Sequence, residues 1–470
     1  MIDTAALRKR ILDLAIQGLL TPDVTIDECV NSKVNNILIE NEIANDIVQS
    51  DIPFEIKNTW CWIKLGWIMG IERGGSPRPI KAYITEEEDG INWIKIGDVS
   101  KDGKYIEKTK EKIKAEGEKK SRHVYPGDFL LTNSMSFGRP YITKIDGCVH
   151  DGWLILRNTE KLFDMNFLYH LLSSSYVYNQ FSKKASGATV DNLNIDKVAD
   201  AIIPLPPVEE QKIIVEKVEE MMQYLETISK LQIMYSSDLE VLKSKIIDAG
   251  IQGKLTEQLP EDGTAEELLE QIEKEKMQFI KEKKAKSTKA LPSITEDELP
   301  FEIPTTWKWV RLSDLVSVLG DGLHGTPSYD EKGDYYFING NNLMNGQILI
   351  KEDTKRINED EWEKYKKPLD RTTVFVSING TLGNVAFYND EKVILGKSAC
   401  YFNMIIEKMK YYVYWILKSN YFMKYAVYSA TGVTIKNVSL KAMNNLLIPL
   451  PPLSEQKRIV EKIDEILSLI

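Results

Sequence analysis

The chain repeats its own sequence, and this repeat constrains the fold more than any other feature. Residues 204–212 read Pro-Leu-Pro-Pro-Val-Glu-Glu-Gln-Lys, and residues 449–457 read Pro-Leu-Pro-Pro-Leu-Ser-Glu-Gln-Lys. Residues 186–192 return as residues 431–437 at the same offset of 245 residues. A repeat of whole-domain length predicts a pseudo-twofold molecule. Such a molecule suits a roughly twofold partner, of which duplex DNA is the commonest.

Two further motifs show that the repeat is circular. Pro-Phe-Glu-Ile followed by Trp-x-Trp occurs at residues 53–62 and again at 300–309. The stretch 7–21, ending Ile-Gln-Gly-Leu-Leu-Thr, returns as 242–256, which follows the first Pro-Leu-Pro-Pro motif. The second Pro-Leu-Pro-Pro motif is followed by only part of a helix, and its missing continuation resembles the start of the chain. We therefore expect the two ends to meet and complete a second helical element together.

Composition is that of an ordinary globular protein. A chain of 470 residues predicts two or more domains, and 43% hydrophobic with 28% charged residues is typical of the class. The net charge of −10 argues against a general polyanion binder, although local basic faces can still bind DNA. No apolar run approaches the length of a membrane span. The cysteines have no CxxC spacing and are predicted to be reduced thiols of a cytoplasmic protein: Cys29, Cys61, Cys148 and Cys400.

Residues 208–253 are predicted to form one long helix with a heptad seam. Pro206 and Pro207 precede it and Gly253 ends it. Apolar residues alternate at steps of four and three for about five heptads, and the polar Gln232 on the seam can fix the register. The seam comprises Ile214, Val218, Met221, Leu225, Ile228, Gln232, Tyr235, Leu239, Leu242, Ile246 and Ala249, with Ile459, Ile463, Ile466 and Ile470 in the second copy and Leu7, Ile11 and Leu14 at the N-terminus. Two helices packed together explain the pattern best, and separate surface helices are the alternative.

The segments 21–207 and 254–450 are each predicted to form one α+β domain. Each contains short β-rich runs separated by Gly, Asn, Asp and Pro. The runs include residues 93–99 and 129–132 in the first segment, and 335–338 and 373–378 in the second. Helices are predicted at 165–182, 264–286 and 410–428.

No catalytic or metal-binding constellation is predicted. Gly396-Lys397-Ser398 resembles the end of a phosphate-binding loop, but Glu391 stands where the first glycine of that loop is required. His150-Asp151 is more typical of a turn than of a catalytic dyad. The histidines have no metal-ligand spacing with the cysteines: His123, His150, His170 and His324. The chain is therefore expected to perform no chemistry alone.

Polar residues on glycine-supported loops are the candidates for binding DNA, because base edges and phosphates are read by such side chains. Residues 74–79 match 324–328, residues 133–139 match 378–384, and residues 95–98 match 339–342, but the side chains differ. This divergence predicts two readers of different sequences, whereas turn formation alone is the simpler explanation for any single loop. The candidates are Gly75, Ser76, Arg78, Lys95, Asn133, Ser134, Ser136, Arg139, Thr189 and Asn192 in the first segment, and His324, Thr326, Asn339, Asn341, Asn342, Asn379, Thr381, Asn384, Thr434, Lys436 and Asn437 in the second.

The ordered, repeated set of motifs resembles the specificity subunit of Type I restriction-modification systems. It comprises the Pro-Leu-Pro-Pro-x-x-Glu-Gln-x-x-Ile-Val helix start, the Ser/Thr-Gly-x-Thr loop before it, Pro-Phe-Glu-Ile with Trp-x-Trp, and Ile-Gln-Gly-x-Leu-Thr. The resemblance covers the whole chain.

The resemblance implies a non-catalytic subunit with two target-recognition domains, 21–207 and 254–450, each reading one half of a bipartite, asymmetric DNA site. Antiparallel helical spacers, formed by residues 1–20, 208–253 and 451–470, would set the half-site spacing and bind two methyltransferase subunits. S-adenosylmethionine would bind those subunits, and ATP with Mg²⁺ would bind the restriction and translocase subunits. One departure is that the second spacer lacks the equivalent of about residues 223–235.

Two other functions remain compatible with the residues alone. One is a coiled-coil scaffold with two protein-binding domains, and the other is an enzyme with an unrecognised active site. A scaffold would show no salt-dependent affinity for duplex DNA.

Overall fold

The computed structural model describes the chain except for residues 23–28, 101–102, 134–136, 186–192, 283–290 and 431–436. It divides into two compact units, residues Met1–Met234 and Tyr235–Ile470. The division falls within one helix, α7 (Val208–Ile251), so each unit contains one part of that helix. Among the described residues, no helix combines the length and the apolar character needed to cross a bilayer.

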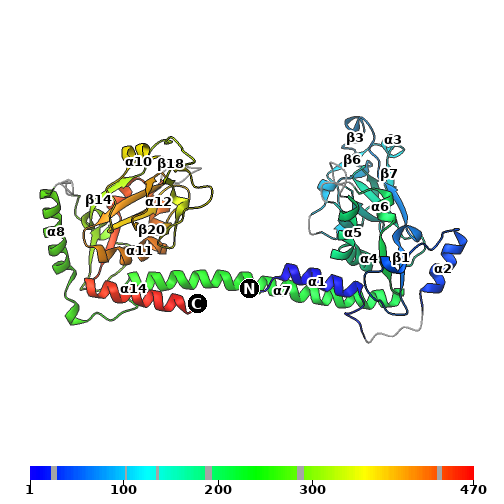
Figure 1. Ribbon diagram of the computed structural model, residues 1–470, viewed down its shortest axis with the longest axis horizontal. Coiled ribbons are helices and arrows are strands. Elements are labelled where there is room, and N and C mark those ends of the chain that lie inside the picture. Colours follow the sequence, from blue (N-terminus) through cyan, green and yellow to red (C-terminus); the bar gives the residue numbers. More distant parts are fainter. Residues whose placement is uncertain (23–28, 101–102, 134–136, 186–192, 283–290, 431–436) are drawn as a thin grey trace. The chain divides into compact units, whose positions relative to one another are not determined.

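The first unit is mixed α+β (Figure 1). Its remaining helices are α1 (Thr4–Ile16), α2 (Asn31–Glu40), α3 (Ala115–Glu118), α4 (Met165–Leu172), α5 (Ser175–Ala185) and α6 (Ile195–Ala199). Its strands are β1 (Cys61–Lys64), β2 (Gly70–Arg73), β3 (Ile84–Thr85), β4 (Ile91–Ile94), β5 (Tyr105–Ile106), β6 (Glu111–Ile113), β7 (Arg122–Val124), β8 (Phe129–Thr132), β9 (Pro140–Thr143), β10 (Gly147–Val149), β11 (Trp153–Arg157) and β12 (Ile202–Leu205). They form two five-stranded sheets, β2-β11-β8-β9-β5 and β3-β6-β4-β10-β7, and a separate β1-β12 pair.

The second unit repeats this plan, but one of its sheets is smaller than its counterpart in the first unit. Its helices are α8 (Ala265–Lys281), α9 (Leu312–Leu315), α10 (Glu359–Tyr365), α11 (Lys410–Lys418), α12 (Asn420–Ser429), α13 (Leu440–Asn445) and α14 (Leu453–Ser468). Its strands are β13 (Lys308–Arg311), β14 (Val316–Asp321), β15 (Tyr335–Ile338), β16 (Leu343–Met344), β17 (Gln347–Ile348), β18 (Arg356–Ile357), β19 (Thr373–Ser377), β20 (Val385–Phe387), β21 (Val393–Leu395), β22 (Ala399–Met404) and β23 (Leu447–Leu450). They pair as β14-β22-β19-β20, β18-β15-β21, β16-β17 and β13-β23.

The sheets β2-β11-β8-β9-β5 and β14-β22-β19-β20 are the central sheets of the two units, and each is buried on both faces. The outer sheets are β3-β6-β4-β10-β7 and β18-β15-β21. In the first unit, Leu154 and Leu156 of β11 pack into the core that contains α4 and α5, while Trp153 and Ile155 face the core shared with the outer sheet. Successive strand residues point to opposite faces, so burial of both faces requires continuous apolar runs. In the second unit, Val374 and Phe375 of β19 divide between two cores in the same way.

The repeated motifs meet where each helix enters its domain. The indole Nε1 of Trp60 donates to Glu210 over 2.7 Å, and that of Trp307 donates to Glu455 over 2.8 Å. Both carboxylates are buried. Gly18 and Gly253 have positive φ and lie against these tryptophan rings, so the end of each Ile-Gln-Gly motif packs on the start of the next helix. The repeated residues thus form the packing that joins helix to domain.

Each unit contains an antiparallel helix pair, as predicted. In the first unit, Ser229 Oγ donates to Thr4 Oγ1 over 2.9 Å near the start of α1, whereas Leu12 and Ile16 share a core with Ile214 and Val218. Figure 1 shows α1 lying along α7. In the second unit, the end of α7 pairs with α14, because a Cβ added at Gly250 would lie 2.7 Å from Ile463. That the two chain ends meet stays a prediction.

Most residues of the predicted heptad seam are buried or half-buried, but four of them are exposed. Ile214, Val218, Leu225, Ile246, Ile459 and Ile463 are buried, and Met221, Ile228, Gln232, Leu239, Ala249 and Ile466 are half-buried. Tyr235 is 63% exposed, and Leu7, Leu242 and Ile470 are also exposed. Val215, Ile247 and Ile251 are buried although they lie off the seam, because the ends of α7 also pack into the domain cores.

Each helix predicted at the end of a domain is two helices. The predicted helix 165–182 is α4 and α5, and 410–428 is α11 and α12. At each break a serine hydroxyl, Ser174 Oγ or Ser419 Oγ, donates to a preceding carbonyl and accepts an N–H of the next helix. Serine competes for backbone hydrogen bonds in this way and favours a new helix start. The charged helix predicted from 264 to 286 is α8, which begins with a capping box at Thr264 and ends earlier.

Candidate nucleic-acid interface

Three of the predicted residues in the first unit meet around Asp151, on the turn between β10 and β11. Ser76 Oγ donates to Asp151 Oδ1 over 2.9 Å, and Asn133 Nδ2 donates to the Asp151 carbonyl over 2.7 Å. Arg78 Nη2 lies 3.5 Å from Asp151 Oδ2, and its side chain is 84% exposed. We call Ser76, Arg78, Asn133 and Asp151 the Asp151 cluster. It joins three loops that are distant in the sequence.

Glycine allows these loops to approach closely. A Cβ on Gly74 would lie 2.2 Å from the carbonyl oxygen of His150, and one on Gly75 would lie 3.1 Å from that of Lys120. The Gly74 N–H donates to the carbonyl oxygen of Trp153, and the Gly75 N–H donates to the carbonyl oxygen of Val149. The loop therefore lies on the end of the sheet and presents Ser76 and Arg78 beside Asp151.

Asp151 is a carboxylate at neutral pH. Partial burial raises the pKa of this carboxyl, but the hydrogen bond from Ser76 and the charges of His150 and Arg78 outweigh burial and hold the pKa below its ordinary value. A carboxylate can accept a hydrogen bond from the N4 amine of cytosine, and a nearby arginine can donate to guanine. The cluster thus offers both an acceptor and a donor for base edges.

The Asn133 side chain is buried within the Asp151 cluster, and Lys95 and Arg139 are half-buried. Lys95 Nζ lies 2.6 Å from Glu111 Oε1 in a half-buried ion pair. Arg139 is half-buried, and its backbone N–H donates to Thr132 Oγ1 over 2.9 Å.

In the second unit two of the corresponding turns meet the 339–342 turn around Ser398. Ser398 Oγ donates to Asn339 Oδ1 over 3.0 Å and accepts the Gly340 N–H over 2.8 Å. Asn384 Nδ2 donates to the Gly340 carbonyl over 3.1 Å, and the Asn379 N–H donates to the Ser398 carbonyl over 3.1 Å. We call Asn339, Asn379, Asn384 and Ser398 the Ser398 cluster. It consists of amides and a hydroxyl, with no carboxylate among its members.

Asn342 has a structural position that does not suit base reading. It is buried, its Oδ1 accepts the Asn339 N–H, and its Nδ2 donates to Leu349 over 2.9 Å. Asp98 holds the same position in the first unit, where it accepts the Lys95 N–H over 2.9 Å. The predicted match of 95–98 with 339–342 is therefore a repeated turn, and Asn342 stabilises it.

Other predicted residues lie on exposed surface. Asn341, Thr326 and Thr381 are exposed, and the His324 ring, whose Nε2 contacts Asp321 Oδ2, is 70% exposed. The counterpart of the 74–79 loop in the second unit begins two residues earlier than the sequence indicated. Gly322, not His324, makes the contact that Gly74 makes in the first unit, since its N–H donates to Ala399.

Most candidates in the Ser/Thr-Gly loops, and two in the 133–139 loop, cannot be placed in the fold. Ser134, Ser136, Thr189, Asn192, Thr434 and Lys436 lie outside the described residues. Asn437 is half-buried and pairs through its backbone with Asn379. Sequence reasoning missed Asp151 and Ser398 as members of these clusters. In the sequence, Asp151 stands in a pair that resembles a catalytic dyad, and Ser398 stands in a triplet that resembles the end of a phosphate-binding loop. Neither resemblance indicates a role in a polar cluster.

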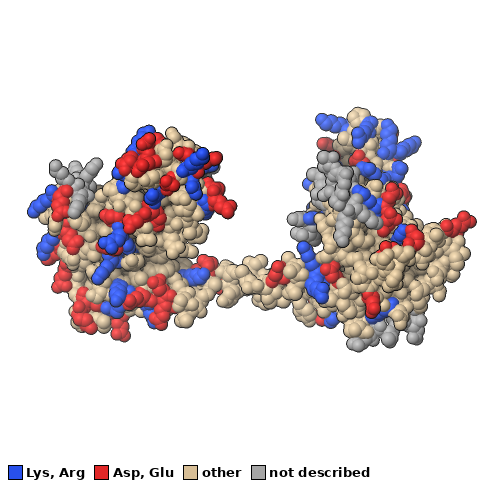
Figure 2. Space-filling model, viewed as in Figure 1, with Lys and Arg blue, Asp and Glu red and all other residues tan. Residues whose placement is uncertain are grey.

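Basic side chains gather on one part of the first unit. Figure 2 shows Lys and Arg over the region of β3, α3 and β7. Exposed members of this basic surface are Lys81, Lys114, Lys119, Lys120 and Arg122. Around α10 of the second unit acidic residues predominate instead, with Glu359, Asp360 and Glu363 beside Lys364. The net negative charge of the chain therefore coexists with a local basic surface.

The histidines and cysteines show no metal-ligand spacing along the sequence, but the fold brings one of each together. His123 and Cys148 are 25 residues apart in sequence but directly opposite one another on β7 and β10. Together with Glu118 they place three ligand atoms within 4.8 Å of one another. Spacing along the chain could not reveal this, because strand pairing brings the residues together.

Comparison with known proteins decides the family. The family model described as Type I restriction modification DNA specificity domain matches residues 58–234 and 304–470, more than two thirds of the chain. Each match begins just before the buried tryptophan of one unit and ends in its spacer helix. The chain belongs to the Type I restriction-modification DNA specificity family.

Individual relatives of this specificity family cover nearly the whole chain. The Type I restriction enzyme EcoAI specificity subunit of Escherichia coli is 25% identical over 98% of this chain and 88% of its own length. The crystal structure of the HsdS subunit from Thermoanaerobacter tengcongensis has a TM-score of 0.52 at 18% identity, covering 90% of this chain and 92% of that one. A chain from a structure of complex assembly and conformational transition of the Type I R-M system has a TM-score of 0.59 at 20% identity, covering 89% and 92%. The two solved structures share the fold.

Proposed function

We propose that this chain is the DNA sequence-recognition subunit of a Type I restriction-modification complex and catalyses no step itself. Each recognition domain, 21–207 and 254–450, reads one half of a bipartite, asymmetric site. The observation that carries this proposal is the contrast between the two clusters. They share two turns of a repeated frame, yet one presents Arg78 and Asp151 while the other presents Asn339 and Asn384.

The helical segments 1–20, 208–253 and 451–470 are proposed to bind two methyltransferase subunits and to fix the gap between half-sites. S-adenosylmethionine then belongs to those partners, and ATP with Mg²⁺ belongs to the restriction and translocase subunits. Four free cysteines are typical of a reducing compartment, so we place the complex in the cytoplasm.

The methyltransferase surface can be tested with Glu216, an exposed residue of α7. Glu216→Lys is expected to weaken assembly with the methyltransferase subunit, measured by size-exclusion chromatography of the mixed proteins. Glu160→Lys makes the same charge change on an exposed residue after β11 and serves as the control. Equal assembly of both variants would place the partner elsewhere.

The spacing can be tested by lengthening α7. Its 44 residues span about 66 Å, which corresponds to at most about 19 base pairs of straight duplex. In the first unit Gln232 donates to the Ile2 carbonyl, just before α1, and in the second unit Ile247 and Asp248 contact the domain, so four residues inserted after Gln232 lie between these two sets of contacts. The insertion adds about 6 Å and keeps the apolar stripe nearly in phase. We expect the same half-sites with one or two more unspecified base pairs between them.

The function itself is tested by mapping methylated adenines. The chain and its methyltransferase subunit are expressed together in a host without other adenine methylation, and the genome is sequenced for modified bases. We expect one motif with two defined halves and an unspecified gap. Methylation at a single contiguous motif, or binding to duplex DNA without sequence preference, would refute the bipartite reader.

A further inference from the structure

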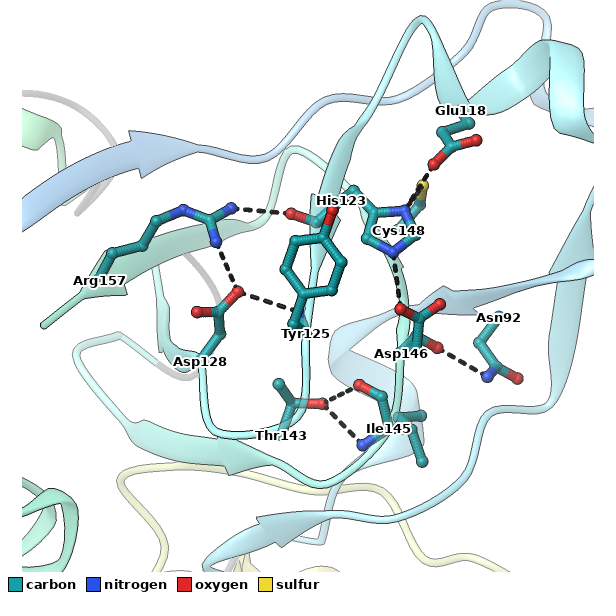
Figure 3. Close-up of polar contacts among 10 residues, drawn as sticks. All are labelled: Asn92, Glu118, His123, Tyr125, Asp128, Thr143, Ile145, Asp146, Cys148 and Arg157. Atoms are coloured by element: carbon teal, nitrogen blue, oxygen red, sulfur yellow. Dashed lines mark hydrogen bonds and ion pairs between the residues drawn. The ribbon is translucent and has the colours of Figure 1, made fainter. Parts of the chain in front are cut away.

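Glu118, His123 and Cys148 form a group of three different metal-ligating side chains in the first unit, and nothing in the DNA-reading role uses them. Glu118 ends α3, His123 lies on β7 and Cys148 lies on β10. His123 Nδ1 is 2.6 Å from Glu118 Oε1 and 4.0 Å from Cys148 Sγ. Figure 3 shows the carboxylate and the sulfur on the same side of the imidazole ring. We propose that this group binds one Zn²⁺ ion.

A fourth residue holds the imidazole in the orientation that a metal ligand needs. Asp146 Oδ2 lies 2.9 Å from His123 Nε2, on the opposite side of the ring from Glu118 (Figure 3). When a metal replaces any proton on Nδ1, this carboxylate accepts the remaining Nε2–H, so the lone pair of Nδ1 points toward Glu118 and Cys148. Metal-bound histidines usually have such a partner on the other nitrogen. Asn92 Nδ2 donates to the Asp146 carbonyl over 2.8 Å and fixes the turn that carries this carboxylate.

The backbone already provides most of the geometry. His123 and Cys148 are direct partners in an antiparallel strand pair, so their side chains share one face of the sheet. Tetrahedral zinc with nitrogen, sulfur and oxygen ligands separates its ligand atoms by about 3.4–3.6 Å. The sulfur must therefore approach by about half an ångström, and the carboxylate must retreat by less than about 1 Å. The Glu118 side chain is 42% exposed and can move, whereas Cys148 is fully buried and is held by the sheet.

The mixture of ligands selects the class of metal. Thiolate and imidazole favour zinc over magnesium or calcium, which prefer oxygen ligands alone. Binding replaces the thiol S–H bond with a sulfur–zinc bond and any proton on Nδ1 with a nitrogen–zinc bond, and these protons pass to water. The exposed side toward Glu118 leaves the fourth position for a water molecule.

A simpler arrangement would be an imidazolium ion between two carboxylates. Burial lowers the pKa of His123, but its hydrogen bonds and ion pairs with Asp146 and Glu118 outweigh burial and raise it. In that arrangement the Cys148 side chain only packs with Trp93 and Ile113 in the core, and its sulfur takes no part in the contacts of the imidazole with the two carboxylates. The zinc site accounts for all three side chains, and it would fix α3 and β7 beneath the basic surface, which includes Lys119, Lys120 and Arg122.

The second unit provides an internal comparison. Cys148 pairs with Trp93 in the first unit, and Ile394 pairs with Phe337 at the corresponding place in the second. Among the described strands, none pairs with the outer edge of β21 as β7 pairs with β10. The zinc site therefore belongs to the first unit alone, and a branched apolar side chain is tolerated at the position of Cys148.

The test measures metal in the full chain. The protein is stripped with a chelator, loaded with Zn²⁺ under reducing conditions, gel-filtered and analysed for bound metal. We expect one zinc per chain in the natural protein and in Cys400→Ser, which changes the buried cysteine of the second unit. Cys148→Val and His123→Gln are expected to lose the metal, and Asp146→Asn to weaken binding by about 10–100-fold.

A second readout guards against variants that misfold. Co²⁺ added to the natural protein should give a thiolate-to-cobalt charge-transfer band with the visible spectrum of a tetrahedral ion, and Cys400→Ser should keep both. Less than a tenth of an equivalent of zinc in the natural protein would overturn the proposal. Equal zinc in folded Cys148→Val and His123→Gln would overturn it as well. Neither result depends on DNA binding, so the proposed function is tested separately.

Discussion

The two units use the same contacts where helix meets domain and different side chains where their sheets end in turns. Trp60 with Glu210 and Trp307 with Glu455 are equivalent within 0.1 Å. Phe54, Trp62 and Tyr176 form an edge-to-face trio that Phe301, Trp309 and Tyr421 repeat. The Asp151 and Ser398 clusters, in contrast, share position but not chemistry. Repetition therefore marks packing, and divergence marks the surfaces available to a ligand.

The largest expected effect concerns a charged difference within the repeated packing. Glu210 pairs with Lys57 Nζ at 2.6 Å, whereas Glu455 accepts from the neutral Gln258 over 2.8 Å. Removing one partner of a buried ion pair leaves the other charge uncompensated. Glu210→Gln is expected to reduce the free energy of unfolding of the first unit by about 3 kcal/mol, the low end for such pairs because Lys57 is partly exposed.

Glu455→Gln is the matched control, with an expected loss of about 1.5 kcal/mol in the second unit, because the donors to this carboxylate from Thr256, Gln258 and Trp307 are neutral and no buried cation is left behind. Hydrogen exchange followed by mass spectrometry in urea reports the two units separately. Equal losses would mean that the repeated contacts are energetically equivalent despite their different partners.

The second prediction uses the histidines, three of which lie in the first unit. Burial lowers the pKa of His170 to about 4, Lys104 acts in the same direction, and Glu219 and Asp164 oppose it. The unfolded chain takes up this proton near pH 6.5, but the folded chain does so only near pH 4, so stability falls as pH decreases through this window. The contribution of His170 is a loss of about 2 kcal/mol between pH 7 and pH 5.

His170→Phe keeps a buried ring and removes the titrating group. The free energy of unfolding of this variant should change between pH 7 and pH 5 by about 2 kcal/mol less than that of the natural chain. The second unit should behave identically in both proteins. An unchanged pH dependence of the first unit would show that His170 is not buried as a neutral ring.

The smallest predicted effect compares one exposed side chain from each unit. Arg78→Ala is expected to reduce discrimination at one half-site by about 1 kcal/mol, the low end for a base contact because Asp151 competes for the guanidinium. His324→Ala should act on the other half-site only. Binding of duplexes altered in one half at a time measures both. Loss of discrimination in both halves from either variant would contradict separate readers.

The sequence predicted packing better than surface chemistry. The strands at 129–132 and 335–338 agree with β8 and β15, because short continuous apolar runs leave a strong pattern. The long helix was predicted to within two residues of its end. The breaks at Ser174 and Ser419 were missed, since a serine cap inside an apolar run resembles an ordinary helical position.

The candidate sites were only partly predictable. Arg78, Asn133, Asn339 and Asn384 were identified as polar loop residues, but Asp151 and Ser398, around which they meet, depend on which turns the sheet brings together. Asn342 was predicted to read bases but is buried in a turn. The sequence alone does not distinguish an asparagine that stabilises a turn from one that reads a base.

The exchange of one recognition domain tests the central claim most directly. Residues 21–207 are replaced by the corresponding domain of a relative that reads a different site, and methylated adenines are mapped with the methyltransferase subunit present. The account predicts that one half of the motif changes, while the other half and the gap stay the same. A motif altered in both halves, or altered in neither, would contradict two domains that each read their own half-site.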